Sequence, residues 1–396
     1  METKGSKSNI FSRIKVILVS AFIGASLGIS VSILPPDILS RITGFWHNSV
    51  YNAASGMVVF DIAAGAVVLI WAYYLQVIIH ECGHLVFGLI SGYKFVSIRV
   101  SRFTLIRDNG KFRMKRFFVE GTGGQCLMDP PGMEEGTPYI LYNLGGVLFN
   151  FLSVLICIAV FGLFDSLFPL SFFLLTMILF GISAMFFNGV PMRIGGIAND
   201  AYNIQLLKND EIARKAFFLQ LRVNSLLSGG IRMKDMPEEW FILPADADPG
   251  NYLHASVRIM EGSRYMDKLD FDGAYTCFDS IRPYFPELIE FYRREVSCEL
   301  IFLKILKGQT KTEIRRMFTP DMQDYVKRYE KYMLNKKRLL YAYALLIERD
   351  EEKASGIYGD VQRMLPLYPL KGDADSELAI MNYVKDFLQD KNEKDR

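Results

Sequence analysis

The sequence predicts an α-helical polytopic membrane protein, with four transmembrane helices and a small β-hairpin, followed by an all-α soluble domain. Three observations support this fold class. Of the 396 residues, 51% are hydrophobic and the mean hydropathy is +0.17, which is too apolar for an ordinary soluble domain. Four apolar stretches in the first half of the chain are long enough to span a bilayer. The second half has a more polar composition with helical periodicity.

The first two predicted spans cover about residues 16–34 and 57–90. The first is uncharged and follows a basic N-terminus. Because no clear cleavage site comes after it, we expect a retained helix rather than a signal peptide. The second run is longer than a hydrocarbon core of about 30 Å requires. We therefore expect it to tilt, to kink at a glycine or to emerge into the interface.

The other two predicted spans cover about residues 139–163 and 168–192. The stretch that contains them carries a single charge, Asp165, which marks the turn between the two helices. Basic residues concentrate before the first span and after the second, and the turn at 164–168 has none. The positive-inside rule therefore places both termini in the cytoplasm. We expect a multi-pass protein, most simply of the cell (plasma) membrane.

Residues 95–118 predict a β-hairpin at the cytoplasmic face. Apolar and polar side chains alternate in "FVSIRVSRFTLIRDNGKFRMKRFF", and its Asn-Gly pair is a strong signal for a type I′ turn. The alternative is a basic surface loop that binds anionic lipid, which is compatible with a hairpin.

The predicted domains are a transmembrane domain at 1–205, a linker at 206–251 and a cytoplasmic α-helical domain at 252–396. Stretches around Ala274 and Ala354 each place an acidic turn before an amphipathic helix that ends near proline. This pattern resembles the second helix of tetratricopeptide repeats. Because the spacing of the two alanines is not a multiple of that repeat's length, a regular array and an irregular helical domain both remain open. In either case we expect the domain to recruit substrate or a protein partner.

Charge and cysteine content narrow the classes of function. The net charge is +2, so the overall charge does not favour nucleic acid as a partner. The five cysteines are odd in number and include no CxxC pair. We interpret them as reduced thiols rather than as a disulfide framework.

The sequence "VIIHECGHLVFGLI", residues 77–90, carries the main chemical signal, because His80, Glu81 and His84 interrupt an apolar run. HExxH on a helix puts both imidazoles on one face, where they can bind one Zn²⁺, while the glutamate holds the water that zinc activates. The structural alternative is that the histidines bond to neighbouring helices and that Glu81 is protonated. Ionisable groups inside a span are by default functional, which favours the metal site.

Zinc requires a third protein ligand and an open position for water. Pro191, Gly195 and Gly196 should break the last span and turn the chain back towards the histidines. Asp200 follows that turn, so we predict it as the third ligand. The competing carboxylates near the cytoplasmic ends of the spans, which we expect in a flexible gating loop, are Glu120, Asp129, Glu134 and Glu135.

Three motifs together resemble those of the site-2 protease family of intramembrane zinc metalloproteases. They are HECGH in a membrane helix, "NLGGVLFN" at 143–150 in the next helix, and an NxxP turn at 188–191 followed by an aspartate. The resemblance covers about residues 56–203. In that family the aspartate follows the proline more closely and precedes a glycine, whereas here it lies nine residues beyond the proline and precedes an alanine.

The resemblance implies a role for each matched position. His80, His84 and Asp200 would bind Zn²⁺, and Glu81 would be the catalytic base. The positions that would support the site or contact the substrate are Gly145, Gly146, Asn150, Asn188 and Pro191.

These expectations describe a hydrolase, a zinc metalloendopeptidase that cuts a membrane-spanning or membrane-associated protein or peptide near the cytoplasmic face of the lipid bilayer. Release of a membrane-bound regulator and maturation of a signalling peptide are both compatible with the sequence. The alternative is a membrane protein that holds zinc without proteolysis and serves in binding or as a scaffold.

Overall fold

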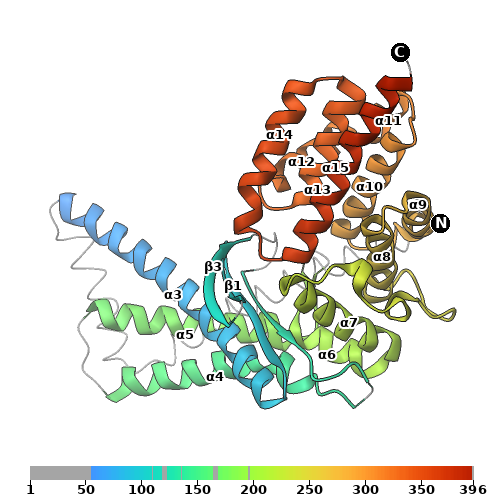
Figure 1. The fold of residues 1–396 in the computed structure, drawn as a ribbon. Coiled ribbons are helices and arrows are strands. Elements are labelled where there is room, and N and C mark those ends of the chain that lie inside the picture. Colours follow the sequence, from blue (N-terminus) through green and yellow to red (C-terminus); the bar gives the residue numbers. More distant parts are fainter. Residues whose placement is uncertain are drawn as a thin grey trace. The chain divides into compact units, whose positions relative to one another are not determined.

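The computed structural model describes residues 55–108, 110–117, 123–134, 136–163, 168–194 and 197–394 of the chain. These residues are mostly helical and include a small antiparallel sheet (Figure 1). The chain divides into two compact units. One contains the chain up to Ser91 together with Pro138–Gln205, and the other contains Gly92–Thr137 together with Leu206–Arg396. The predicted span at 16–34 lies outside the described residues.

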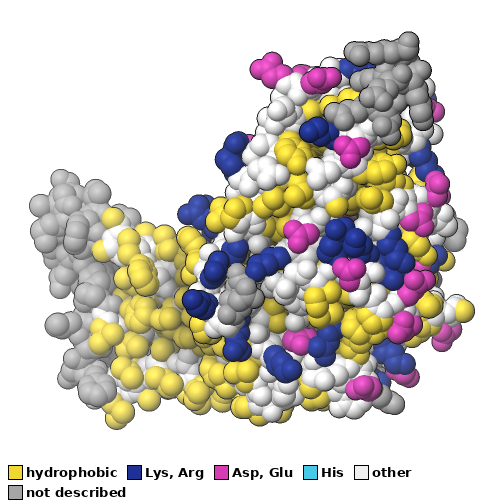
Figure 2. All heavy atoms as spheres, viewed as in Figure 1, with side chains coloured by type: hydrophobic (Ala, Val, Ile, Leu, Met, Phe, Trp, Pro, Cys, Tyr) yellow, Lys and Arg dark blue, Asp and Glu magenta, His cyan; other side chains and the backbone are white. Residues whose placement is uncertain are grey.

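Three long helices form the body of the first unit: α3 (Ser55–Ile90), α4 (Ile140–Leu163) and α5 (Phe168–Gly189). Each packs against the other two. Each is long and apolar enough to cross a membrane, because hydrophobic side chains cover its outer surface as well as its contacts (Figure 2). The described residues therefore contain three of the four predicted spans.

Two glycines bring α3 and α4 into backbone contact. A Cβ atom on Gly83 would lie 2.2 Å from the carbonyl oxygen of Gly145, and a Cβ on Gly145 would lie 2.4 Å from the carbonyl oxygen of Gly83. Side chains at either position would force the helices apart. This contact therefore depends on both residues being glycine, and it lies one residue before His84.

The chain turns back immediately after α5. The short strands β5 (Arg193–Ile194) and β6 (Ile197–Ala198) pair as an antiparallel ribbon, and α6 (Asp200–Asn209) follows at once. Helix α5 ends at Gly189, close to the predicted break at Pro191. Gly195 and Gly196, which were expected to help the turn, lie outside the described residues.

The second unit contains a four-stranded antiparallel sheet in the order β3-β2-β1-β4. The strands are β1 (Lys94–Val100), β2 (Phe103–Asp108), β3 (Lys111–Arg116) and β4 (Gly124–Asp129). The sequence predicts only one hairpin here, and strands β2 and β3 flank its Asn-Gly turn. The fourth strand was missed because its central residues are buried in succession, so they lack the alternation of a half-exposed strand.

Helices make up the rest of the second unit. The α-helices are α7 (Glu211–Ser228), α8 (Tyr252–Asp267), α9 (Phe271–Ile281), α10 (Glu290–Leu306), α11 (Lys311–Met317), α12 (Pro320–Tyr329), α13 (Leu334–Ala342), α14 (Glu351–Met364) and α15 (Lys371–Lys394). Short helical turns are η2 (Met233–Asp235), η3 (Glu238–Phe241), η4 (Arg282–Tyr284), η5 (Tyr343–Glu348) and η6 (Leu365–Leu367). Ala274 of α9 and Ala354 of α14 are both buried in its hydrophobic core.

The segment expected as a linker, 206–251, contains an ordinary packed helix. Asp210 caps α7 by accepting a hydrogen bond from the backbone N–H of Ala213, and α7 packs against α8, α15 and β4. Its Arg222 donates to Asp129 Oδ2 and to the Pro130 carbonyl, both at 2.7 Å. The helix was missed because proline- and aspartate-rich turns after it dominate the composition of the segment.

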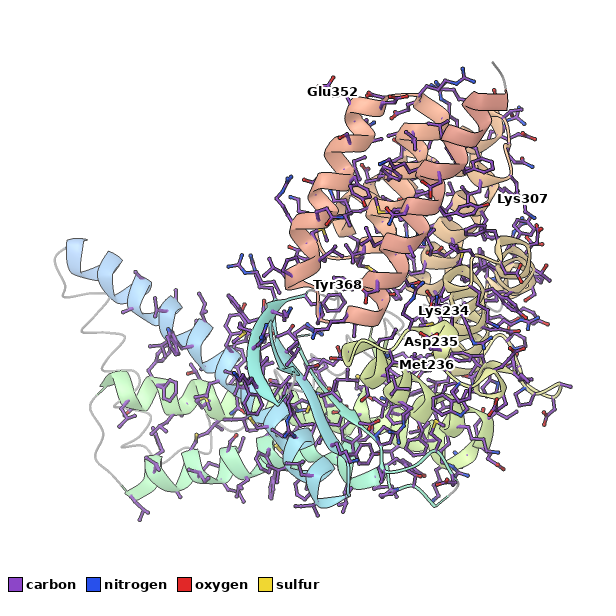
Figure 3. All side chains as sticks on the ribbon, viewed as in Figure 1. Lys234, Asp235, Met236, Lys307, Glu352 and Tyr368 are labelled. Carbon is purple, nitrogen blue, oxygen red and sulfur yellow. The ribbon has the colours of Figure 1, made fainter. Side chains whose placement is uncertain are left out.

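The sheet is joined to the C-terminal helices by side chains. Lys115 of β3 donates to the carbonyl oxygen of Pro366 in η6. The ring of Phe117 packs edge-on against Tyr368, with centroids 5.8 Å apart. Figure 3 labels Tyr368 near the start of the last helices. The predicted boundary at residue 205 therefore does not match the compact units, because the sheet lies before that boundary but groups with the helices that follow it.

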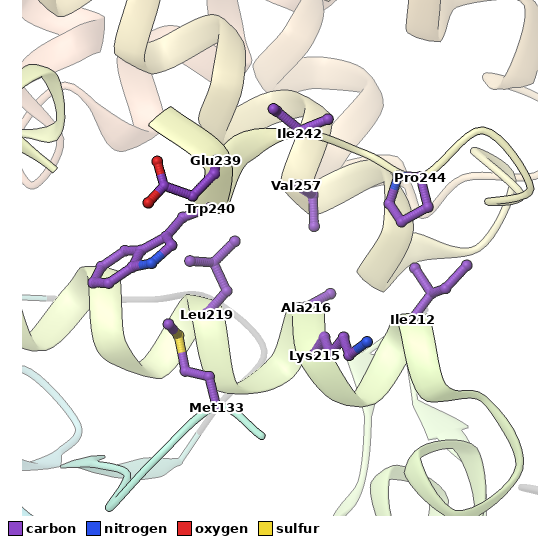
Figure 4. Close-up of a pocket in the computed structure, with 10 residues that line it drawn as sticks. All are labelled: Met133, Ile212, Lys215, Ala216, Leu219, Glu239, Trp240, Ile242, Pro244 and Val257. Carbon is purple, nitrogen blue, oxygen red and sulfur yellow. The ribbon is translucent and has the colours of Figure 1, made fainter. Parts of the chain in front are cut away.

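A shallow cavity of about 230 Å³ lies within the same unit (Figure 4). The residues of α7 and α8 that line it are mainly apolar, and Trp240 and Pro244 close its other side. Lys215 and Glu239 are its charged lining residues. The cavity lacks the clustered ionisable groups found in the first unit.

Candidate metal centre

Three side chains from two separate segments of the first unit converge at one point. His80 and His84 lie one turn apart on α3, and Asp200 is the first residue of α6. The two Nε2 atoms are 3.1 Å apart, and Asp200 Oδ2 lies 3.2 Å from that of His80 and 3.5 Å from that of His84. The histidines are only 9% and 8% exposed. This cluster could hold a metal ion.

The other nitrogen of each imidazole is already engaged. His84 Nδ1 lies 2.7 Å from the carbonyl oxygen of Tyr142, which can only accept, so Nδ1 carries the proton. His80 Nδ1 lies 2.7 Å from Asn150 Oδ1 and has the same arrangement. In the neutral imidazoles both Nε2 lone pairs therefore point into the cluster. Two lone pairs and a carboxylate oxygen at these distances repel one another unless a cation, either a proton or a metal ion, lies between them.

The charge of Asp200 fits such a role. Burial raises the pKa of its carboxyl, but the charge and hydrogen bonds of the His84 and His80 imidazoles, which share a proton with it when no metal is bound, outweigh burial and hold the pKa below its usual range. A metal ligand of this kind must be ionised. The carboxylate is therefore in the state that binds a cation.

Asn199 fixes the position of Asp200. Its side-chain oxygen accepts from the backbone N–H of Tyr202 at 2.9 Å, which makes it the N-cap of α6. Its amide nitrogen donates to the carbonyl oxygens of Phe187 and Val190, both at 2.6 Å. One buried side chain thus joins the start of α6 to the end of α5.

Asn199 also closes the base of the ribbon. Its backbone N–H donates to the Met192 carbonyl, and its side-chain oxygen accepts from the Met192 N–H, both at 3.2 Å. Strands β5 and β6 lie between these two positions in the sequence, and the two ends of the segment meet through these hydrogen bonds. Asp200 therefore lies next to the end of the last span in space, although it follows Pro191 by nine residues.

Glu81 lies between the two histidines in α3. It is 5% exposed and interacts electrostatically with the His84 imidazole. It belongs to the same helical turn as the two histidines, and its carboxylate is not one of the three groups that converge at the cluster.

The glycine pair predicted to support the site leaves space for it. A Cβ atom on Gly146 would lie 2.4 Å from Cε1 of the His80 ring. Gly145 makes the backbone contact with Gly83 described above. Asn150, one helical turn after Gly146, forms the hydrogen bond to His80. The GG-x-x-x-N pattern thus surrounds one face of this imidazole.

The remaining predicted residues are not part of the cluster. The Asn188 side chain donates to the Ala184 carbonyl within its own helix at 3.0 Å, and Pro191 is exposed after the helix end. Of the competing acids, Asp129 lies in strand β4, not in a loop, and is paired with Arg222. Glu134 is exposed, and Glu120 and Glu135 lie outside the described residues.

Sequence reasoning missed three contributors to the site. Asn199 could have been recognised from the sequence, since asparagine directly before an aspartate at a helix start is typical of an N-cap. Gln76 is a weaker sequence signal, as an uncharged polar residue one turn before His80. Tyr142 could not have been recognised, because it contributes a backbone carbonyl and not its side chain.

Comparison of the chain with models of protein families, with curated proteins and with solved structures gave no match.

Proposed function

We propose that this chain is an intramembrane zinc metalloprotease that resembles the site-2 proteases. The observation that carries the proposal is the triangle formed by His80 Nε2, His84 Nε2 and Asp200 Oδ2, with edges of 3.1, 3.2 and 3.5 Å. Tetrahedral zinc with bonds of about 2.0–2.2 Å separates its ligand atoms by about 3.4 Å. The three atoms would thus accept the ion with little rearrangement.

The composition of the ligand set also supports zinc. Two imidazoles and one carboxylate form a common catalytic zinc site, which leaves the fourth position open for water. Each ligating histidine also gives its other ring N–H to an oxygen acceptor, Asn150 or the Tyr142 carbonyl. Such partners hold the ring orientation and the tautomer of metal-binding histidines.

Zinc, when bound, would lower the pKa of its water ligand and polarise the scissile carbonyl. Glu81 would take the proton from that water on its carboxylate and deliver it to the nitrogen of the departing amine. His80, His84 and Asp200 would keep their positions throughout, since the surrounding hydrogen bonds hold each of them. The reaction would be hydrolysis of a peptide bond.

The substrate follows from where the cluster lies. His84 is six residues from the end of α3 at Ile90, so the cut would fall near one surface of the membrane. The basic segment that follows α3 favours the cytoplasmic surface. The substrate would be a membrane-spanning or membrane-associated protein or peptide, which the C-terminal helical domain would help to recruit. We place the protein in the plasma membrane with both termini in the cytoplasm.

The decisive experiment is substitution of Glu81. Purified wild type should hold about one zinc per chain and cleave a co-reconstituted single-pass substrate. Glu81→Gln should retain the metal and lose cleavage, because it removes the base but no ligand. Glu134→Gln, which changes an exposed acid in the same way, is the control and should cleave normally.

Cleavage by Glu81→Gln at the wild-type rate would refute the assignment. Zinc binding by a wild type that cleaves none of the candidate substrates would instead favour the non-proteolytic, zinc-holding alternative.

A further inference from the structure

A chain of buried amide groups leads across all three membrane helices to His80. Gln76 of α3 is 2% exposed, and its Nε2 donates to the Met177 carbonyl of α5 at 2.8 Å. Its Oε1 accepts from Asn150 Nδ2 of α4 at 2.8 Å. Asn150 in turn presents Oδ1 to His80 Nδ1.

The hydrogen-bonding groups fix the direction of this chain. The Met177 carbonyl can only accept, so the Gln76 amide must turn its nitrogen towards α5. Its oxygen then faces Asn150 and requires a donor. Asn150 Nδ2 supplies it and also donates to the backbone carbonyl of Gln76 at 3.1 Å. The amide oxygen of Asn150 is thereby left for His80.

The surrounding residues accommodate this arrangement. Ser153 exchanges hydrogen bonds of 3.1 Å with both ends of the Gln76 amide. A Cβ atom on Gly181 of α5 would lie 2.5 Å from Val154 Cγ2 and 2.9 Å from Gln76 Nε2, so glycine leaves room for both side chains. A buried amide is expensive in an apolar setting unless its groups are paired, and here both ends are paired.

We propose that Gln76 is a positioning residue that sets the tautomer of His80 through Asn150. With the Asn150 oxygen facing it, His80 keeps its proton on Nδ1 and its lone pair on Nε2, inside the cluster. If Asn150 rotated its amide by half a turn, its NH₂ group would face Nδ1. The ring proton would then move to Nε2, and the lone pair would leave the cluster.

This inference rests on the proposed metal site, but one of its readouts does not. Polar contacts between membrane helices also act as simple adhesion, which would change helix packing without changing a tautomer. Histidine ¹⁵N resonances distinguish the two tautomers directly. The chain has four histidines, so the resonances can be assigned with single substitutions. This measurement uses the full chain without metal.

The experiment compares three substitutions in the full chain in lipid nanodiscs. Gln76→Met removes both ends of the amide at nearly constant length. Gln76→Glu keeps an acceptor for Asn150 and, when protonated in this apolar place, a donor for Met177. Thr176→Val is the matched control, because Thr176 is a buried polar residue of α5 whose hydroxyl, among the described residues, donates within its own helix to the Phe173 carbonyl.

Gln76→Met leaves Asn150 Nδ2 only its longer bond to the Gln76 backbone carbonyl, so we expect mixed tautomers at His80. His84 should be unchanged, since its Nδ1 is held by the Tyr142 carbonyl. The zinc affinity of Gln76→Met, measured by competition with a chelating dye, should fall about 10–100-fold. Gln76→Glu should keep a His80 tautomer and a zinc affinity close to those of wild type, and Thr176→Val should resemble wild type in both. Gly181→Ala, which crowds the same amide from α5, should produce the Gln76→Met changes in milder form and serves if Gln76→Met does not fold.

A single wild-type tautomer at His80 in Gln76→Met would overturn the proposal, and so would an equal loss of affinity in Thr176→Val. If wild type binds no metal, the proposed function fails, whereas the tautomer measurement still decides the role of Gln76.

Discussion

The position of Asp200 depends on a residue that does not touch the cluster. Asn199 caps α6 and holds the end of α5, so the carboxylate at the first turn of α6 points towards the two histidines. The geometry of His80 and His84 was predictable, because a spacing of four residues on a helix is a local property. The path of the chain to Asp200 depends on tertiary hydrogen bonds that no spacing rule describes.

Asp200→Ala should abolish stoichiometric zinc binding and cleavage. It removes one of three protein ligands and leaves two histidines, which hold zinc weakly. Zinc content after dialysis and cleavage of a single-pass substrate are the measurements. Asp129→Ala is the control and should keep its zinc, because Asp129 is bound by Arg222. Full zinc occupancy in Asp200→Ala would show that another group completes the site.

At the scale of secondary structure, the site depends on how closely α3 and α4 approach. Hydropathy predicted both helices well, since length and apolar composition are properties of each segment alone. It did not predict their contact through Gly83 and Gly145. Hydropathy also gave no indication of the space that Gly146 leaves for the His80 ring. The effect of a missing side chain depends on which residue of the neighbouring helix packs against the glycine, and hydropathy does not contain that information.

Gly146→Ala should weaken metal binding more than it weakens the fold. The added methyl group would overlap the His80 ring, and overpacking of this kind costs about 1–3 kcal/mol. Gly162→Ala in the same helix is the control, because a Cβ there meets nothing within 4 Å. Zinc affinity and thermal unfolding should be measured for both. Equal affinities in the two variants would contradict the proposed role of Gly146.

The C-terminal helices carry a buried ionic cluster of their own. Arg338 of α13 donates to Glu377 of α15 at 2.6 Å and to Glu299 of α10 at 2.7 Å. Burial raises the pKa of Glu377 to about 7 against the pull of Arg338, and burial raises that of Asp373 to about 6. The folded state therefore binds protons that the unfolded chain releases at lower pH.

The stability of the full chain should consequently fall as pH rises from 5.5 to 8. The contribution of the two protonated carboxyls is complete below their unfolded pKa values and is lost through pH 6–7. Thermal unfolding followed by circular dichroism tests this, since about 1 kcal/mol moves Tm by about 2–4 °C in a domain of this size. Glu377→Gln should reduce the pH dependence. A higher Tm at pH 8 than at pH 5.5 would contradict it.

For the whole molecule, the two compact units do not follow the order of the chain. The sheet lies between α3 and α4 in sequence, yet Lys115 and Phe117 contact the C-terminal helices and Asp129 pairs with Arg222 of α7. Composition predicted an apolar first half and a polar second half. It could not predict this grouping, because contacts between single side chains far apart in the sequence do not change the composition of either segment.

Reporter fusions test the orientation of the whole chain. Fusions at the N-terminus, near Asn109 and at the C-terminus should all report cytoplasm, and a fusion near Phe164 should report the opposite side. An alkaline phosphatase and a green fluorescent protein at each site provide opposite signals and so control for expression. Export of a reporter at Asn109 would reverse the topology and would move the cut to the other surface.

The closed ribbon between Met192 and Asn199 separates two quantities that motif descriptions usually treat as one. The count of residues from Pro191 to Asp200 includes β5 and β6, whereas Met192 and Asn199 are joined directly by two hydrogen bonds. The position of Asp200 in space therefore follows from these paired residues and not from the number of residues between them. In this chain, the place of Asp200 is better described by an asparagine that ties the end of α5 to the start of α6 than by a fixed interval after the proline.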